Sequence, residues 1–426
     1  MQSAIQGRRA RSWLLATALA LATPMAVQAS PLTLAEALER TAAADPARPA
    51  LAARLSAAEA GVRQAGVRPN PVVGVDVEDL AGSGPYSLID RAQTTLYYEQ
   101  TRERGGKRAA RVALARGDIA LFRLRDDVRV LDLLHEADLA WVEAVFGEAE
   151  AALAADRLAL AERARGEVSR RVKAARDPLF AGARADAQVA EARLALTQAR
   201  TRASDARRAL AAYWGGGEIE IDAAALEDLS VAGRVAGPAS PVDLALLDAQ
   251  RDLAGARVRV EESKAVQDPT WRAGLRYLND DGAVAAVVGG SIPLGRHDTN
   301  RGAIDQARAE RQAADLDLAG ARSVLERRIA ATQAALAQKA AEAGRIQDEI
   351  VPANARTVDL VRDGFNRGGF SYLDVLEAQK ALIEARSRRL TVLKAFQVDR
   401  AQLDRLTGAH ARLIPASQAT ASESAR

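Results

Sequence analysis

The chain has 426 residues, including 59 Lys or Arg and 56 Asp or Glu, and it contains no cysteine. This excludes structural disulfides, thiolate metal sites, a cysteine nucleophile and an N-terminal lipid anchor. Alanine, leucine, arginine and glutamate dominate, whereas aromatic residues make up only 4%, a composition typical of long helices or coiled coils.

Residues 1–29 are predicted to be a secretory signal peptide. Three arginines precede an apolar run from Trp13 to Val27, and compact residues up to Ala29 suit cleavage there. The run is too short to span a membrane comfortably as a helix, and no later stretch is apolar enough to do so. Without those arginines, 56 basic residues balance 56 acidic ones. We therefore expect an exported, nearly neutral protein with no nucleic-acid partner.

The rest of the sequence is predicted to use one structural unit twice, in residues 30–235 and 236–408. Each unit begins with a helical stretch that ends at a proline, over 34–66 in the first and 242–266 in the second. Two short extended segments, a very long helix, a break and a return helix follow in each. A polar tail is expected at 409–426.

The two long helices are predicted over 107–175 and 301–366. At about 1.5 Å per residue, the first would span on the order of 100 Å. In each unit the two shorter helices together match the long helix in length, so they are expected to lie end to end beside it. Pro352 should kink the second long helix. The first carries a coiled-coil spacing of apolar residues: Leu121, Leu124, Val128 and Leu131.

Four short segments alternate between apolar and polar or small residues and are predicted to be transmembrane β-strands. They cover residues 73–77, 96–101, 271–277 and 284–292. Trp271 and Tyr277 would suit the aromatic girdles at the two membrane interfaces. An arginine facing lipid costs about 2–4 kcal/mol near the midplane. Arg272 and Arg276 are therefore predicted to face a water-filled barrel lumen.

Four strands leave two open sheet edges, and in lipid every unpaired backbone group is costly. The barrel is therefore expected to close between chains. Two chains would give eight strands around a filled interior, whereas three would give twelve around an open lumen, which suits a conduit. The alternative is a soluble hairpin on each helical arm, as in a periplasmic coiled-coil adaptor or scaffold.

This order of elements resembles the TolC-type outer membrane efflux family over essentially the whole mature chain. The sharpest motifs are Gly364-Phe-Asn-Arg-Gly-Gly-Phe-Ser-Tyr-Leu-Asp-Val-Leu-Glu-Ala-Gln379 and Ser291-Ile-Pro-Leu-Gly295. Arg104-Gly-Gly-Lys-Arg108 is most similar to the heavy-metal, cobalt-zinc-cadmium branch. The resemblance implies a mainly α chain with a transmembrane β-barrel portion. Long antiparallel helices would form a trimeric α-helical barrel, and four strands per chain would contribute to a 12-stranded outer membrane barrel.

The resemblance also implies roles for individual residues. Asp374 and Glu377 would constrict the pore at its periplasmic end; the alternative is that they pair with Arg367 or Lys380 on a solvated helix face. The helix-hairpin tips would dock onto a periplasmic adaptor. The tip residues are Arg176, Asp177, Pro178, Leu179, Gly368, Gly369, Phe370, Ser371 and Leu373.

The implied function is a passive exit duct in a tripartite efflux system of the resistance-nodulation-division type. Its partners would be two sister chains, a periplasmic adaptor, an inner-membrane proton-driven pump and outer membrane lipid. The implied cargo is heavy-metal cations, with drugs or a secreted protein as alternatives. His135, His297 and His410 are far apart in sequence. No catalytic residue, cofactor or metal site is therefore expected, and no enzyme.

Overall fold

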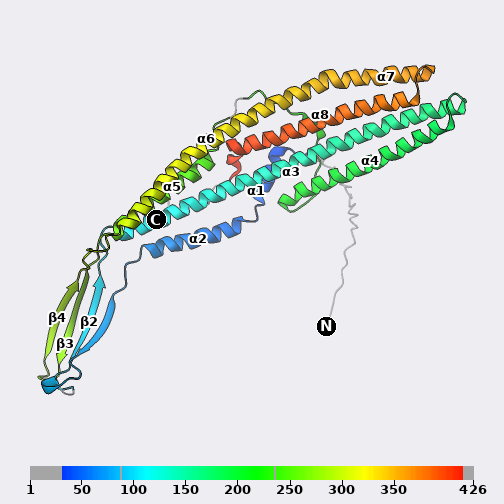
Figure 1. Ribbon diagram of the computed structural model, residues 1–426. Coiled ribbons are helices and arrows are strands. Elements are labelled where there is room, and N and C mark those ends of the chain that lie inside the picture. The colour runs from blue at the N-terminus through cyan, green and yellow to red at the C-terminus, as the bar shows by residue number, and fades with distance from the viewer. Residues whose placement is uncertain (1–30, 87–88, 235–236, 416–426) are drawn as a thin grey trace, which may run out of the picture.

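Long helices make up most of the molecule, and one small sheet extends from one end of it (Figure 1). The computed structural model describes residues 31–86, 89–234 and 237–415. The predicted signal peptide lies outside the described residues, as does the predicted tail beyond residue 415.

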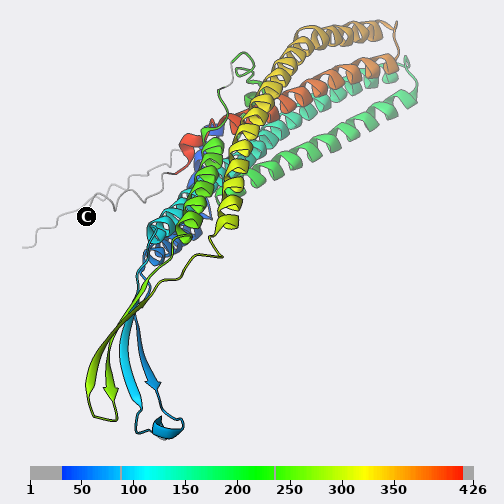
Figure 2. The same ribbon diagram turned by 60° about the vertical axis from the view of Figure 1, so that its left-hand side comes forward.

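The longest element is helix α3 (Lys107–Lys173), with 67 residues. Helix α4 (Leu179–Ala211) runs back along its far half, and α2 (Arg48–Ala65) lies along the half nearer the sheet (Figures 1 and 2). Small residues allow α3 and α4 to approach closely, because a Cβ atom at Gly147 of α3 would lie 3.0 Å from the Cα of Ala203 in α4.

The second half of the chain has the same arrangement. Helices α6 (Arg301–Arg345) and α7 (Val351–Arg367) together form one long rod, and α8 (Tyr372–Thr407) and α5 (Pro241–Lys264) lie against it. We call the helices of the first half the first arm and those of the second half the second arm; the end of each arm far from the sheet is its tip. The two arms contact each other mainly through α3, which packs against both α5 and α8. The expectation that two shorter helices lie beside each long one therefore holds.

The first predicted helix, over 34–66, is in fact two helices. Helix α1 (Leu34–Ala43) ends before Asp45, and α2 begins at Arg48. Pro46 explains the break, because proline disfavours helical backbone in the residue before it and has no amide hydrogen to donate. The carboxylate of Asp45 accepts a hydrogen bond from Ala47 N and pairs with Arg129 of α3 at 2.6 Å, which holds the break against the long helix.

The second long helix is interrupted where the sequence predicts, although by a wider turn. A π-helical turn, Ile346–Ile350, separates α6 from α7, and Pro352 is the second residue of α7. Because proline cannot donate to the carbonyl four residues earlier, the local shift to a wider hydrogen-bonding ring accommodates it. Figure 2 shows the arm bending along its length.

The four predicted strands form one antiparallel sheet in the order β1-β2-β3-β4. Their bounds are β1 Val72–Glu78, β2 Gln93–Thr101, β3 Thr270–Leu278 and β4 Val284–Ser291. Strands β2 and β3 come from different halves of the chain, and their pairing joins the two halves at this end. Within the described residues, β1 and β4 each have a neighbour on one side only.

Buried apolar residues gather in separate clusters along the bundle rather than in one core. The largest includes Trp141 and Val145 of α3, Leu210 of α4 and Leu393 of α8. Another lies at the tip end, where Val168, Phe365 and Val375 meet. A predominantly helical chain with long antiparallel helices and four strands agrees with the predicted fold class.

Candidate functional site

The two faces of the sheet differ in polarity. On one face, Val75 of β1 lies opposite Leu96 of β2, which in turn lies opposite Leu275 of β3. These three side chains are each more than half exposed, and Val288 of β4 on the same face is 81% exposed. A continuous apolar face of this kind has no partner within the described chain.

The opposite face carries the ionised residues. Arg272 Nη1 lies 3.2 Å from Asp76 Oδ2, and Arg276 Nη2 lies 2.6 Å from Glu78 Oε2. Both pairs reach across β2 to join β3 to β1, and the Arg272 guanidinium also lies over the Tyr97 ring at 4.8 Å. The two arginines predicted to avoid lipid therefore lie on the polar face.

The aromatic residues proposed for a girdle lie on the apolar face. Trp271 is at the end of β3 nearer the helices and Tyr277 is at the far end; they are 58% and 47% exposed. Tyr98 of β2, at the same end as Trp271, shares this face. Aromatic side chains at both ends of an apolar band are typical of membrane interfaces.

At the tip of the second arm, Asp374 lies in the first turn of α8 and forms a capping box with Ser371. Its Oδ2 accepts hydrogen bonds from Ser371 N and Ser371 Oγ, both at 2.8 Å. These bonds from Ser371 lower the pKa of the Asp374 carboxyl. Glu377, one turn further on, is exposed. Among the described residues neither carboxylate pairs with Arg367 or Lys380, and Lys380 instead lies 3.6 Å from Glu384.

The turn of this tip depends on two glycines. Gly368 has a φ of +88°, a left-handed conformation that glycine adopts without strain, and it ends α7. Phe370 folds back onto Gly364 of α7, so closely that a Cβ atom at residue 364 would lie 2.1 Å from its ring. Gly364 therefore lies inside α7 and leaves the space that the Phe370 ring occupies.

At the tip of the first arm, Arg171 organises the turn. Its guanidinium makes two hydrogen bonds to the Asp177 carboxylate, at 2.8 and 2.9 Å, and also contacts the carbonyl oxygen of Phe365 in the other arm. The hydrogen bond from Arg171 lowers the pKa of the Asp177 carboxyl. One of the residues predicted to dock onto a partner thus already takes part in an internal ion pair.

The remaining predicted docking residues are exposed at the two tips: Arg176, Pro178, Leu179, Gly368, Gly369, Phe370, Ser371 and Leu373. Leu179 is 83% exposed, and Phe370 and Leu373 are each nearly half exposed. Two further residues of the tips were not singled out from the sequence: Arg171, which organises the first turn, and Phe180, which is 69% exposed. A signal for Phe180 existed, since it directly follows Leu179 at the start of the return helix.

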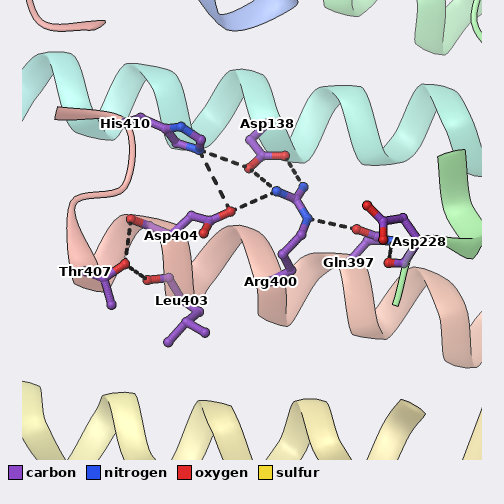
Figure 3. A network of polar contacts seen from close by, with 8 residues as sticks. All are labelled: Asp138, Asp228, Gln397, Arg400, Leu403, Asp404, Thr407 and His410. Carbon is purple, nitrogen blue, oxygen red and sulfur yellow. Dashed lines mark hydrogen bonds and ion pairs between the residues drawn. The ribbon is translucent and has the colours of Figure 1, made fainter. Parts of the chain in front are cut away.

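Midway along the bundle, Arg400 of α8 is the centre of a buried polar network (Figure 3). Its guanidinium bonds to both oxygens of Asp138 in α3, at 2.5 and 3.2 Å, and to Asp404 at 2.9 Å. Its Nε donates to Gln397, whose amide in turn donates to the Asp228 carbonyl oxygen at 2.9 Å. Burial raises the pKa of the Asp404 carboxyl. This network locks α8 against α3.

His410 completes one group that could be considered for a metal ion. Its Nε2 lies 3.8 Å from Asp138 Oδ2 and 4.0 Å from Asp404 Oδ2. Arg400 Nη1 already contacts the same two oxygens, so the positive charge that a cation would bring is present. These residues therefore do not suit a resident metal.

Among the described residues no helix is both long and apolar enough to cross a membrane.

Comparison with known proteins identifies relatives that match most of the chain. Residues 243–409 match the family model described as outer membrane efflux protein. The cobalt-zinc-cadmium resistance protein CzcC of Cupriavidus metallidurans is 29% identical over 391 residues, covering 89% of this chain and 91% of CzcC. The nickel and cobalt resistance protein CnrC of the same organism is 30% identical over 345 residues, covering 77% of this chain and 78% of CnrC.

Two solved structures share the fold. CusC, in crystal structures concerned with transmembrane channel formation, superposes with a TM-score of 0.67 at 14% identity, covering 88% of this chain and 92% of the other. The outer membrane protein VceC of Vibrio cholerae superposes with a TM-score of 0.66 at 20% identity, covering 89% and 96%. The same arrangement of long helices and strands thus occurs in proteins of low sequence identity.

Proposed function

This chain belongs to the outer membrane efflux protein family, and from that premise we propose that three copies close into one passive duct for heavy-metal cations. An outer membrane efflux component of this family is a transport duct and not an enzyme. The proposal adds the number of chains, the cargo and the residues that control passage. It also places the sheet in the outer membrane and the helices in the periplasm, after export by the signal peptide at 1–29.

The observation that carries the proposal is the sheet with two open edges and one apolar face. Strands β1 and β4 each lack a neighbour on one side among the described residues, and the apolar face is widely exposed. In a membrane, backbone groups on such edges must pair, and closed symmetric assembly supplies the partners. Three chains give twelve strands, which leaves a lumen where two chains would not.

The polar face would line this lumen. Arg272 is bonded to Asp76 and Arg276 to Glu78, and Glu99, opposite Arg272, adds one further negative charge to this face. A wet lumen with so little net charge would let ions pass without holding them. The apolar face with Trp271 and Tyr277 would then contact lipid, and β1 of one chain would pair with β4 of the next.

The helical end would form the periplasmic tunnel. Asp374 and Glu377 lie at the tip of the second arm, where three copies would bring six carboxylates around the axis. Six negative charges so close together would attract cations into the opening. The exposed tip residues, with Leu179 and Phe370 among the most apolar, would dock onto a periplasmic adaptor that links the duct to an inner-membrane proton-driven pump.

The metal cargo is proposed from the relatives. The two proteins of Cupriavidus metallidurans described above are named for resistance to cobalt, zinc and cadmium and to nickel and cobalt. Sequence matches that cover most of each protein favour a cargo of the same class for this chain. Tight binding by the duct is not required, because a conduit that held ions strongly would not release them.

A resistance profile tests the cargo. The gene is deleted, and growth is measured on cobalt, nickel, zinc and cadmium salts and on several antibiotics. The proposal predicts lost tolerance to one or more of the metals and unchanged tolerance to the antibiotics, with recovery when the gene is restored. Loss of antibiotic tolerance alone would assign the same duct to drugs and contradict the metal cargo.

A further inference from the structure

A cleft of about 1390 Å³ lies where the sheet joins the helices. Its walls come from the segment between α2 and β1, from the last residues of β2 and from the start of α3. Tyr98 and Trp271 line it from the apolar face of the sheet. The cleft therefore opens on the side that, under the proposed function, meets lipid rather than the lumen.

The basic residues around this cleft fall into two groups. Lys107 pairs with Asp268 at 2.6 Å, and Arg111 pairs with Glu103, so their charges are neutralised within the junction. Arg68, Arg102 and Arg108, which also line the cleft, are exposed and have no ion-pair partner among the described residues. Three positive charges therefore remain available in one concave site.

The backbone adds to this positive potential. Helix α3 begins after Gly106 without a side-chain cap, and its first residues, Lys107, Arg108 and Ala109, line the cleft. The first amide groups of a helix have no partner within the helix and favour an anion nearby. The N-terminus of α3 therefore adds a partial positive charge at the cleft. It supplements the three guanidinium groups but is not the main feature of the site.

The position of the aromatic residues indicates which anion would meet the cleft. Trp271 and Tyr98 are about half exposed at the end of the apolar face nearer the helices. Such side chains lie at the level of lipid headgroups when a β-sheet spans a membrane. The three arginines directly beyond them would thus lie at the depth of the headgroup phosphates. Guanidinium groups match phosphate oxygens in geometry as well as in charge.

We propose that Arg68, Arg102 and Arg108 form a binding site for the phosphate of an anionic phospholipid headgroup in the inner leaflet of the outer membrane. This inference rests on the proposed function, which places the sheet in that membrane. One lipid bound at each junction would fix the depth of the barrel and brace the joint between the strands and α3.

Fluorescence quenching tests the site directly, because Trp271 lines the cleft. The mature full-length chain, with Trp141 and Trp214 replaced by Phe, is reconstituted into phosphatidylcholine vesicles. Small amounts of brominated phosphatidylglycerol or brominated phosphatidylcholine are then added. A site selective for the anionic headgroup should enrich it locally by about fivefold or more. Quenching of Trp271 by the brominated phosphatidylglycerol should therefore exceed quenching by the phosphatidylcholine at equal mole fraction.

The variant R68Q/R102Q/R108Q should lose this excess and keep the quenching by brominated phosphatidylcholine. The matched control R322Q/R328Q/R356Q changes the same total charge at exposed arginines of the helical arm and should keep the excess. Equal quenching by both lipids in the parent protein would overturn the site and leave the duct intact. Absence of quenching by either lipid would instead show that the sheet is not in the membrane.

Two further outcomes would contradict the assignment. If the excess persists in R68Q/R102Q/R108Q, these arginines do not form the site. Inorganic phosphate is also compared with chloride at equal ionic strength. Selective loss of the excess in phosphate would assign the cleft to a free anion and not to a lipid.

Discussion

Arg171 in α3 lies over the ring of Phe365 in α7, with its guanidinium carbon 4.3 Å from the ring centroid. The same side chain bonds to Asp177 at its own tip and to the Phe365 carbonyl oxygen at the other. One arginine therefore joins the two helical arms at the end proposed to narrow the pore. Separation of the arms there requires these contacts to break.

Replacing Arg171 by Met should loosen this junction. The change removes the bidentate pair and the contact to Phe365 while keeping an apolar stem, so the tips can separate at lower cost. We expect a higher single-channel conductance in planar bilayers. Arg170, the exposed preceding residue, has no ion pair among the described residues, and R170M is the matched control. Equal conductance in R171M and R170M would remove Arg171 from any role in closure.

Replacing Gly364 by Ala should destabilise the second tip. Alanine in place of a helical glycine normally stabilises a helix by about 0.5–1 kcal/mol. Here the added methyl would lie 2.1 Å from the Phe370 ring, and overpacking costs about 1–3 kcal/mol. We therefore expect a lower melting temperature. G320A is the control, since nothing lies within 4 Å of a Cβ at that helical position. A melting temperature as high in G364A as in G320A would contradict this packing.

Neutralising the acidic tip should reduce the preference for cations. Alanine at residue 374 would also remove one half of the capping box, because the Asp374 carboxylate accepts the hydrogen bond from Ser371 N. Asn keeps the acceptor oxygen and removes only the charge, so D374N/E377Q is the sharper variant. Reversal potentials in a salt gradient should shift toward anions, and conductance should rise if the carboxylates also narrow the opening. Unchanged selectivity and conductance would exclude both residues from the constriction.

The same site predicts a dependence on pH. Hydrogen bonds from Ser371 lower the pKa of Asp374, so the carboxylate stays charged at a pH where an ordinary aspartate is protonated. Ser371→Ala removes the hydroxyl donor and should raise this pKa. Cation preference in that variant should fall at a higher pH than in the parent protein. Identical pH profiles of the reversal potential would show that Asp374 does not set the selectivity.

Adjacent residues of β4 offer a test of which face meets lipid. Val288 is on the apolar face and 81% exposed, whereas Val287 is on the polar face opposite Gly274. An arginine in lipid near the midplane costs about 2–4 kcal/mol per chain, and three chains multiply this cost. V288R should fail to accumulate in outer membrane fractions, and V287R should accumulate normally. The reverse pattern would mean that the faces are assigned the wrong way round.

Much of the fold follows from local patterns in the sequence. The alternation of Val73, Val75 and Val77 with Gly74 and Asp76 predicts a strand with two different faces, and the sheet has them. The spacing Ser371-Tyr-Leu-Asp374 is that of a capping box. It indicates that Asp374 helps to start α8, a role that the resemblance to a pore motif did not suggest.

Contacts between distant segments were beyond such reasoning. Arg171 and Phe365 are 194 residues apart, and nothing near either residue indicates the other. Gly364 and Phe370 belong to one motif in the sequence, but nothing in that motif indicates that the ring packs onto the glycine. The contacts at the tips join side chains from both arms, and these side chains come close only when the chain is folded.

Chemical cross-linking between the two edge strands tests the central claim, that three chains close one barrel. The chain has no cysteine, so V75C in β1 and V288C in β4 would provide the only two thiols. A short bismaleimide is added to outer membranes that contain the double variant. The account predicts covalent products that end at three chains, and no product in either single variant. If the protein remained as single chains after cross-linking, or if products larger than three chains appeared, the account would be contradicted.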